Sequence, residues 1–115
     1  MEKCSNQVVR TCDVIGKKVL GRDNESLGKV EEIVLDKVNG EVRYAVLSFG
    51  GFMGLGDDFY ALPWKTLEYC QPEDAFKVNV AKETLKSASG FNKDNWPDFA
   101  SASWSKSIND FYTSL

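Results

Sequence analysis

The side chains that most often carry catalysis or hold metals are sparse in this chain of 115 residues. There is no histidine, which removes Ser-His-Asp and Cys-His catalysis and the commonest zinc ligand. The three cysteines, Cys4, Cys12 and Cys70, form no C-x-x-C pair. Their odd count and wide spacing favour free thiols in a reducing compartment. We therefore expect no cofactor, no metal and no enzymatic activity.

A glycine-rich segment at residues 50–56 is the other feature that chemistry could use. Its sequence is Gly-Gly-Phe-Met-Gly-Leu-Gly, and it continues into Asp57 and Asp58. A phosphate-binding loop needs a lysine, a hydroxyl and a following helix, and two adjacent carboxylates would repel a phosphate. This excludes a nucleotide site. Two carboxylates alone are also a weak signal for a hard cation, and they are more often a solvated loop end.

The apolar residues between those glycines are better suited to contacting a protein. Glycines cost backbone entropy on folding, so such a segment is retained where positive φ or a close approach is needed. Aromatic residues and methionine are enriched in interface cores. We predict an interaction surface made of Phe52, Met53, Leu55, Asp57, Asp58 and Trp64, with a symmetric homodimer as its simplest partner arrangement. The alternative is that the loop folds back and only closes the domain.

Charge and hydropathy narrow the possible partners. The chain has 14 basic and 17 acidic residues, and only Lys17 and Lys18 are adjacent basic residues. Nucleic-acid binders usually cluster Lys and Arg on one face, so we expect no DNA partner, and the acidic balance also argues against RNA. No stretch approaches the roughly 18 to 20 apolar residues of a membrane span. We expect a cytoplasmic protein without membrane insertion.

Short strands separated by tight turns must position these residues. The β-rich runs cover residues 14–20, 29–38, 41–49, 59–64, 67–70 and 76–80. The spacing from Val30 to Ile33 breaks strict alternation and predicts a β-bulge near Glu31-Glu32. Asn39-Gly40 predicts a hairpin with a type I′ turn, which needs positive φ at both central residues. This pattern indicates a small barrel or sandwich.

The pattern becomes helical after residue 80. Residues 81–87 favour a helix, and the apolar residues Trp104, Ile108, Phe111 and Leu115 recur on one helical stripe. Proline is tolerated in a first helical turn, so this last helix is predicted to begin near Trp96-Pro97. The tail carries too many large apolar groups to leave in water. We expect it to pack on the barrel or on a second subunit.

Several short motifs occur in a distinctive order. They are Ile15-Gly16-Lys17-Lys18-Val19-Leu20, Ser26-Leu27-Gly28-Lys29-Val30, Val34-Leu35-Asp36, Tyr44-Ala45-Val46, residues 50–56 and Ala61-Leu62-Pro63-Trp64. This order resembles the PRC-barrel family, which is named for the cytoplasmic domain of the photosynthetic reaction-centre H subunit. The tail resembles the extension of small stand-alone bacterial members. The resemblance implies a mainly β fold, a small antiparallel PRC-type β-barrel with a short C-terminal helical extension. It implies an assembly or interaction module and brings no shared catalytic residues.

These observations divide the chain into a flexible N-terminal arm (1–12), a PRC-barrel domain (13–81) and a helical extension (82–115) packed on the barrel or on a partner. We expect a non-enzymatic module that binds a protein partner, including a copy of itself. Two alternatives stay open. One is an RNA- or ribosome-associated module, by analogy with the related domain of a bacterial ribosome-maturation factor, which a salt-dependent shift with RNA would favour. The other is a barrel that binds a small ligand or a metal, although side chains largely fill a small barrel.

Overall fold

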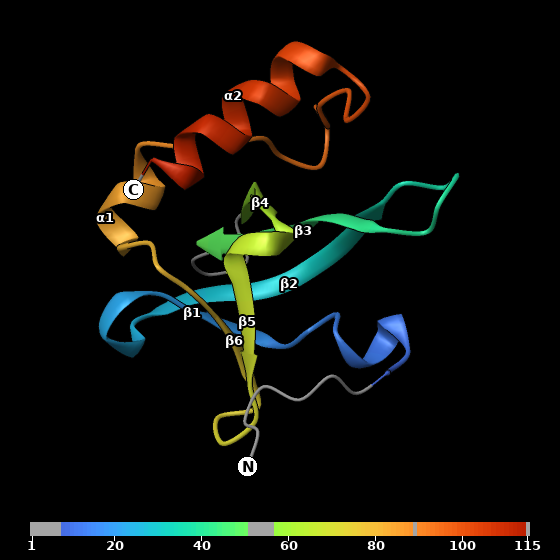
Figure 1. The fold of residues 1–115 in the computed structure, drawn as a ribbon. Coiled ribbons are helices and arrows are strands. Elements are labelled where there is room, and N and C mark those ends of the chain that lie inside the picture. Colours follow the sequence, from blue (N-terminus) through green and yellow to red (C-terminus); the bar gives the residue numbers. More distant parts are fainter. Residues whose placement is uncertain (1–7, 51–56, 89, 115) are drawn as a thin grey trace.

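The computed structural model describes residues 8–50, 57–88 and 90–114 (Figure 1). It contains one sheet followed by two helices. The strands are β1 (Lys18–Leu20), β2 (Ser26–Leu35), β3 (Val42–Gly50), β4 (Asp57–Pro63), β5 (Leu67–Cys70) and β6 (Ala75–Val78). The helices are α1 (Lys82–Lys86) and α2 (Ala102–Thr113), and short 3-10 turns are η1 (Thr11–Asp13), η2 (Arg22–Asn24) and η4 (Trp64–Thr66).

The sheet is curled into a half-barrel with the strand order β4-β3-β2-β1-β6-β5 (Figure 1). This confirms the predicted mainly β, barrel-type fold. The expectation of purely antiparallel pairing is wrong at one place, because β1 and β6 run parallel. After β4, the chain crosses through η4 to the opposite edge of the sheet, where β5 and β6 form a hairpin. That crossing, which a local pattern cannot reveal, sets the direction in which β6 meets β1.

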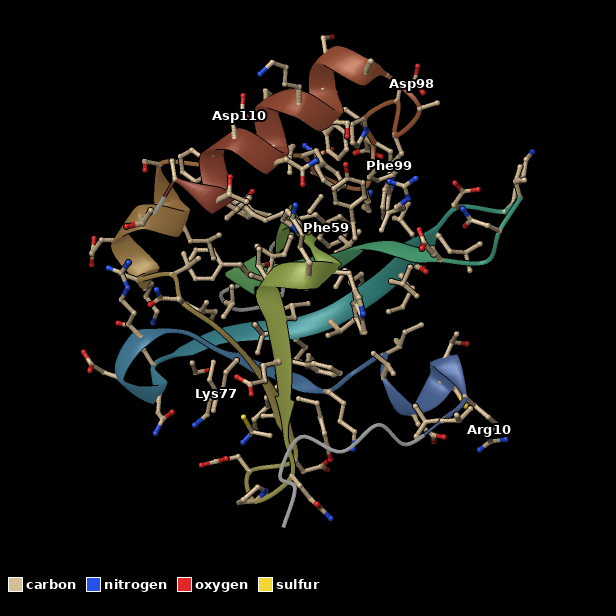
Figure 2. All side chains as sticks on the ribbon, viewed as in Figure 1. Arg10, Phe59, Lys77, Asp98, Phe99 and Asp110 are labelled. Atoms are coloured by element: carbon tan, nitrogen blue, oxygen red, sulfur yellow. The ribbon has the colours of Figure 1, made fainter. Side chains whose placement is uncertain are left out.

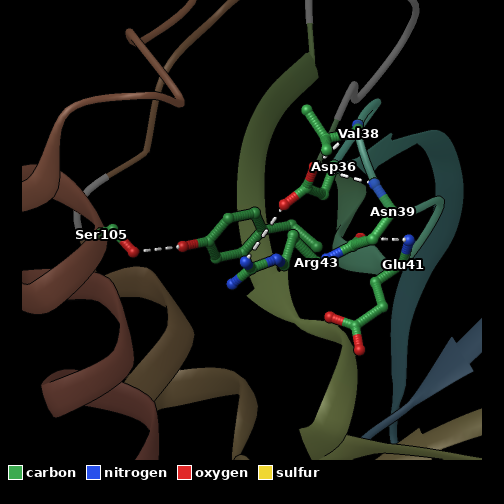
Figure 3. A network of polar contacts seen from close by, with 7 residues as sticks. Asp36, Val38, Asn39, Glu41, Arg43 and Ser105 are labelled. Carbon is green, nitrogen blue, oxygen red and sulfur yellow. Dashed lines mark hydrogen bonds and ion pairs between the residues drawn. The ribbon is translucent and has the colours of Figure 1, made fainter.

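The predicted bulge is confirmed, whereas the predicted turn type is wrong. The β2–β3 register shifts between Val30 and Glu32. The Asn39-Gly40 segment does connect these strands, but Gly40 has a φ of 79° and Asn39 does not have positive φ. Asp36 accounts for the difference: its backbone carbonyl accepts the Gly40 N–H at 2.7 Å, and its carboxylate accepts the Val38 N–H at 2.9 Å (Figure 3). An aspartate that caps its own loop favours a longer turn.

A two-residue turn occurs instead between β1 and β2. Asp23 and Asn24 both have positive φ, at 60° and 59°. The N–H of Glu25 donates to the Arg22 carbonyl at 3.1 Å, which closes the turn. These are the features of the type I′ turn that was expected at residues 39–40. The preceding strand is also shorter than predicted, because η1 and a turn at Gly16 occupy residues 11–17 and β1 begins only at Lys18.

The core lies between the curled sheet and the two helices. Its buried residues include Val19, Leu27, Val30, Tyr44, Leu47, Leu62, Phe76, Leu85, Ile108 and Tyr112. Leu85 comes from α1, and Ile108 and Tyr112 come from α2, so both helices contribute to the same core as the strands. At Gly28 the backbones of β2 and β3 approach so closely that a Cβ there would collide with the Ser48 carbonyl oxygen.

The tail covers one side of the sheet, as Figure 1 shows for α2. Figure 2 shows Phe59 of β4 and Phe99 of the tail between this helix and the rest of the sheet. Trp104 packs edge-on against Tyr44 of β3, with ring centroids 5.2 Å apart. The Tyr44 hydroxyl and the Ser105 Oγ are hydrogen-bonded at 2.8 Å (Figure 3). Trp96 is 42% exposed, although its ring centroid lies 5.4 Å from that of Phe59.

The last helix begins later than predicted. Its N-cap is Ser101, whose Oγ accepts the Trp104 N–H, so α2 starts at Ala102 rather than near Pro97. Between these points the Asp98 carboxylate accepts the Ala100 N–H at 3.0 Å. Such a bond gives the backbone an alternative to a helical turn, and serine is a preferred N-cap residue.

Candidate interaction groove

The structure describes three of the six predicted interaction residues, which are Asp57, Asp58 and Trp64. Phe52, Met53 and Leu55 lie outside the described residues. Asp57 and Asp58 begin β4, where they pair with Gly50 and Phe49. Trp64 follows the last residue of β4. At about 3.3 Å per residue, the strand separates Asp58 from Trp64 by roughly 20 Å. Trp64 therefore lies at the opposite end of β4 from Asp58, and the interaction surface around the glycine-rich segment stays a prediction.

Trp64 instead borders a groove on another part of the surface, which we call the Trp64 groove. Its volume is about 380 Å³. It is lined by Val9, Asp13, Val14, Lys17, Trp64, Tyr69, Asp74 and Phe76. These residues come from the segment before β1, from η4, and from the β5–β6 hairpin. The groove therefore exists only because β6 pairs with β1 and brings residues 69–76 beside residues 9–17.

Three aromatic rings form the inner wall of the groove. Phe76, on β6, is buried and pairs directly across the hairpin with Tyr69. The Tyr69 and Phe76 ring centroids are 5.3 Å apart, and those of Trp64 and Phe76 are 5.7 Å apart. Both pairs are steeply inclined, an arrangement that aromatic rings favour. Val9 completes the wall on the solvent side and is 54% exposed, so part of this apolar surface is open to a partner.

A compact polar network forms the rim of the groove. The Lys17 ammonium lies 2.7 Å from one Asp74 carboxylate oxygen, and the Tyr69 hydroxyl donates to the other at 2.5 Å. These two hydrogen bonds lower the pKa of Asp74. The bond to Asp74 in turn raises the pKa of Lys17 and of Tyr69. At neutral pH the network thus holds one anion and one cation, and its polar atoms already bind one another.

A second ion pair extends the rim. Arg10 Nε lies 3.6 Å from Asp13 Oδ2, and Arg10 is on the side of the sheet away from α2 (Figure 2). Asp13, Lys17 and Asp74 line the groove, and each is paired with an opposite charge, Asp13 with Arg10 and Lys17 with Asp74. These two pairs leave no surplus of either sign among them to attract a strongly charged ligand.

Among the described residues, no cluster of three His, Cys, Asp or Glu side chains is placed to hold a metal ion. In the same part of the chain, no helix is long and apolar enough to cross a membrane. The Cys12 side chain is an exposed thiol, and Cys4 lies outside the described residues.

The sequence pattern singles out Trp64 but not its partners in the groove. It places Tyr69 and Phe76 in strands and indicates no role for Lys17 or Asp74. The aromatic residues in two consecutive short strands, 67–70 and 76–80, are a usable signal for a shared aromatic wall. The pairing of Lys17 with Asp74, 57 residues apart, has no local signal.

Comparison with known proteins agrees with this architecture. A protein-family model described as the PRC-barrel domain matches residues 6–85, which is more than half of the chain. The match includes all six strands and every residue that lines the Trp64 groove, and α2 lies beyond it. A search of curated proteins found no match.

Proposed function

This chain belongs to the PRC-barrel family, and we propose that it is a non-enzymatic protein-interaction module whose partner docks in the Trp64 groove. PRC-barrel domains are interaction and assembly modules, which sets the class of function. The observation that supports this site is an aromatic wall that is partly open to solvent. Beside it lies a rim whose opposite charges are paired with one another. Aromatic residues in a recess surrounded by polar groups are typical of interface centres.

Because the polar groups of the rim already bind one another, the groove favours an apolar side chain of a partner protein over a small polar ligand. A small-molecule site usually offers a few converging polar groups to fix the ligand. Here Asp74 already binds both Lys17 and Tyr69, so a polar ligand would have to break those hydrogen bonds. An apolar side chain of a partner can cover Val9 and the ring of Trp64 without disturbing them.

The same network argues against RNA as the partner at this site. Phosphate binding relies on lysine and arginine side chains whose charge is available. The charges of Lys17 and Arg10 are instead matched by Asp74 and Asp13. The odd number of cysteines in the sequence supports a reducing compartment, so we place this module in the cytoplasm.

The test compares two valine substitutions on different surfaces. Val9→Glu puts a charge on the exposed wall of the groove, whereas Val38→Glu puts the same charge at the β2–β3 hairpin, where the valine is 90% exposed. A phage-displayed peptide library is selected on the immobilised full chain, and the enriched peptides are then titrated against each variant. We expect apolar peptides whose affinity falls at least about tenfold with Val9→Glu, because the charge would have to be buried against the peptide, and is unchanged with Val38→Glu.

Two results would contradict the proposed function. One is a set of enriched peptides that bind Val9→Glu as tightly as they bind the wild type. The other is a selection that enriches nothing above the control without protein. Thermal unfolding of both variants shows that any loss of binding does not arise from loss of the fold.

A further inference from the structure

We propose that Asn39 is a site of spontaneous deamidation, and that Asp36 slows this reaction in the folded chain. Asn39 is the only asparagine in the sequence that precedes a glycine. It lies in the loop between β2 and β3, where both Asn39 and Gly40 are exposed to water. Neither residue lines the Trp64 groove, so this site is independent of the function proposed for that groove.

The reaction joins two groups that are neighbours in the chain. The Gly40 backbone nitrogen loses its proton and attacks Cγ of the Asn39 side chain, so that a bond forms between these two atoms. The Cγ–Nδ2 bond of Asn39 breaks, and the amide group takes up a proton and leaves as ammonia. Water then opens the resulting succinimide at either of its two carbonyl groups. The product at position 39 is therefore aspartate or isoaspartate, and water is the only co-reactant.

Two features of the loop make the Asn39 side chain reactive. Its Oδ1 accepts the Glu41 N–H at 2.9 Å (Figure 3). A donor aimed at this oxygen polarises the carbonyl group and stabilises the negative charge that develops on it during the attack. In addition, Gly40 has no Cβ, and nothing lies within 4 Å of the place that a Cβ would occupy. The attacking nitrogen therefore has room to form the ring.

Asp36 restrains that nitrogen. Its backbone carbonyl accepts the Gly40 N–H at 2.7 Å, and the nitrogen must give up this hydrogen bond before it can lose its proton. The Asp36 carboxylate holds the same loop, because it accepts the Val38 N–H at 2.9 Å and the Asn39 N–H at 3.4 Å (Figure 3). It also forms an ion pair with Arg43 at 3.3 Å. The reaction therefore proceeds from the minor population of molecules in which the loop opens.

Deamidation would change the end of the β2–β3 hairpin. Either product adds a negative charge at position 39, which lies between Asp36 and Glu41 in the sequence and is repelled by both. Isoaspartate also adds a methylene group to the main chain, which lengthens the loop that connects the two strands. The conversion is thus expected to loosen this loop.

The experiment measures deamidation in the fragment of residues 38–43, which trypsin releases by cutting after Lys37 and Arg43. The full chain is incubated at mildly alkaline pH, either native or denatured in guanidinium chloride, and the fragment is analysed by chromatography and mass spectrometry. We expect a mixture of aspartate and isoaspartate at position 39. The native chain should react at least about tenfold more slowly than the denatured chain, because the loop must open first.

Two substitutions at position 36 test its role. Asp36→Ala should raise the native rate at least about threefold, because the carboxylate no longer holds the loop. Asp36→Asn is the matched control, since its amide oxygen can still accept the Val38 N–H, and it should raise the rate less. The denatured variants give the rates that the altered sequences have without the fold, and thermal unfolding shows whether each variant is folded.

Three results would overturn the inference. One is a native wild-type rate equal to the denatured rate, which would show that the loop does not restrain the reaction. This comparison still decides if Asp36→Ala fails to fold. Another is a folded Asp36→Ala variant that reacts no faster than the wild type. The third is aspartate without isoaspartate, which would exclude the succinimide as the intermediate.

Discussion

The carboxylate of Glu25 accepts a hydrogen bond from the backbone N–H of Lys82 at 3.0 Å, across 57 residues of sequence. Glu25 closes the β1–β2 turn, and Lys82 is the first residue of α1. The N-cap residue of this helix, Ala81, makes no side-chain capping bond, so the cap comes from a distant strand connection. The bond holds α1 where its Leu85 side chain is buried in the core.

This distant cap leads to a prediction about stability. Glu25→Ala should lower the free energy of unfolding by about 1 kcal/mol, the usual cost of removing a helix N-cap. Glu25→Gln should retain most of the stability, because its amide oxygen can still accept the Lys82 N–H. Urea denaturation followed by circular dichroism measures both. Equal stability of the alanine variant and the wild type would show that the cap contributes nothing.

The close contact between β2 and β3 leaves no room for a side chain at Gly28. Gly28→Ala should lower the free energy of unfolding by about 3 kcal/mol or more, because the new Cβ would collide with the Ser48 carbonyl oxygen and the φ is 145°. Gly16→Ala is the matched control, with a φ of 95° but nothing within 4 Å of its new Cβ. It should cost only the backbone strain, about 1 to 2 kcal/mol. Chemical denaturation of both variants would reveal the difference, and similar losses would refute this account.

The groove network should make stability depend on pH at both extremes. Folding lowers the pKa of Asp74 from its ordinary value of 3.8, so its contribution is present above that pH and is lost as pH falls through the lowered value. Folding raises the pKa of Lys17 and of Tyr69. Their contributions are present below their ordinary values of 10.5 and 10.0 and are lost as pH rises beyond them.

Asp74→Asn tests this network, since it removes the charge of the carboxylate. Asparagine also tolerates the positive φ of 50° at this position, so the substitution adds no backbone strain. The stability difference between wild type and variant should be constant from about pH 5 to pH 9 and should shrink below about pH 4. Denaturation at a series of pH values measures it. A difference that stays constant down to about pH 2 would show that the Asp74 carboxylate is not the group responsible.

Two buried tyrosine hydroxyls should respond differently to removal. The Tyr44 hydroxyl is hydrogen-bonded to Ser105 and joins β3 to α2, so Tyr44→Phe should cost about 1 kcal/mol. The Tyr112 hydroxyl is buried and has no hydrogen-bond partner among the described residues, and burial raises its pKa. Tyr112→Phe should leave stability unchanged or raise it by up to about 1 kcal/mol. Thermal and urea unfolding of the pair give the comparison, and a larger loss for Tyr112→Phe would contradict it.

The sequence alone is sufficient to locate most of the elements. The strand predicted at residues 67–70 coincides with β5, and the break in alternation after Val30 marks the observed register shift. Alternation along a strand and glycine or proline at its ends are local properties, so they remain visible in a linear chain. The absence of histidine likewise restricts the available chemistry whatever fold the chain adopts.

Only the tertiary structure decided which residues meet. Local propensity favours a type I′ turn at Asn39-Gly40, but the loop-capping carboxylate of Asp36 and the short β1–β2 connection place it at Asp23-Asn24. The parallel pairing of β1 with β6 brings Lys17 beside Asp74 and sets Trp64 against Phe76, far from Asp58. Such contacts depend on how the chain crosses from one edge of the sheet to the other. That path is selected by the packing of the whole core, and no local pattern of residues encodes it.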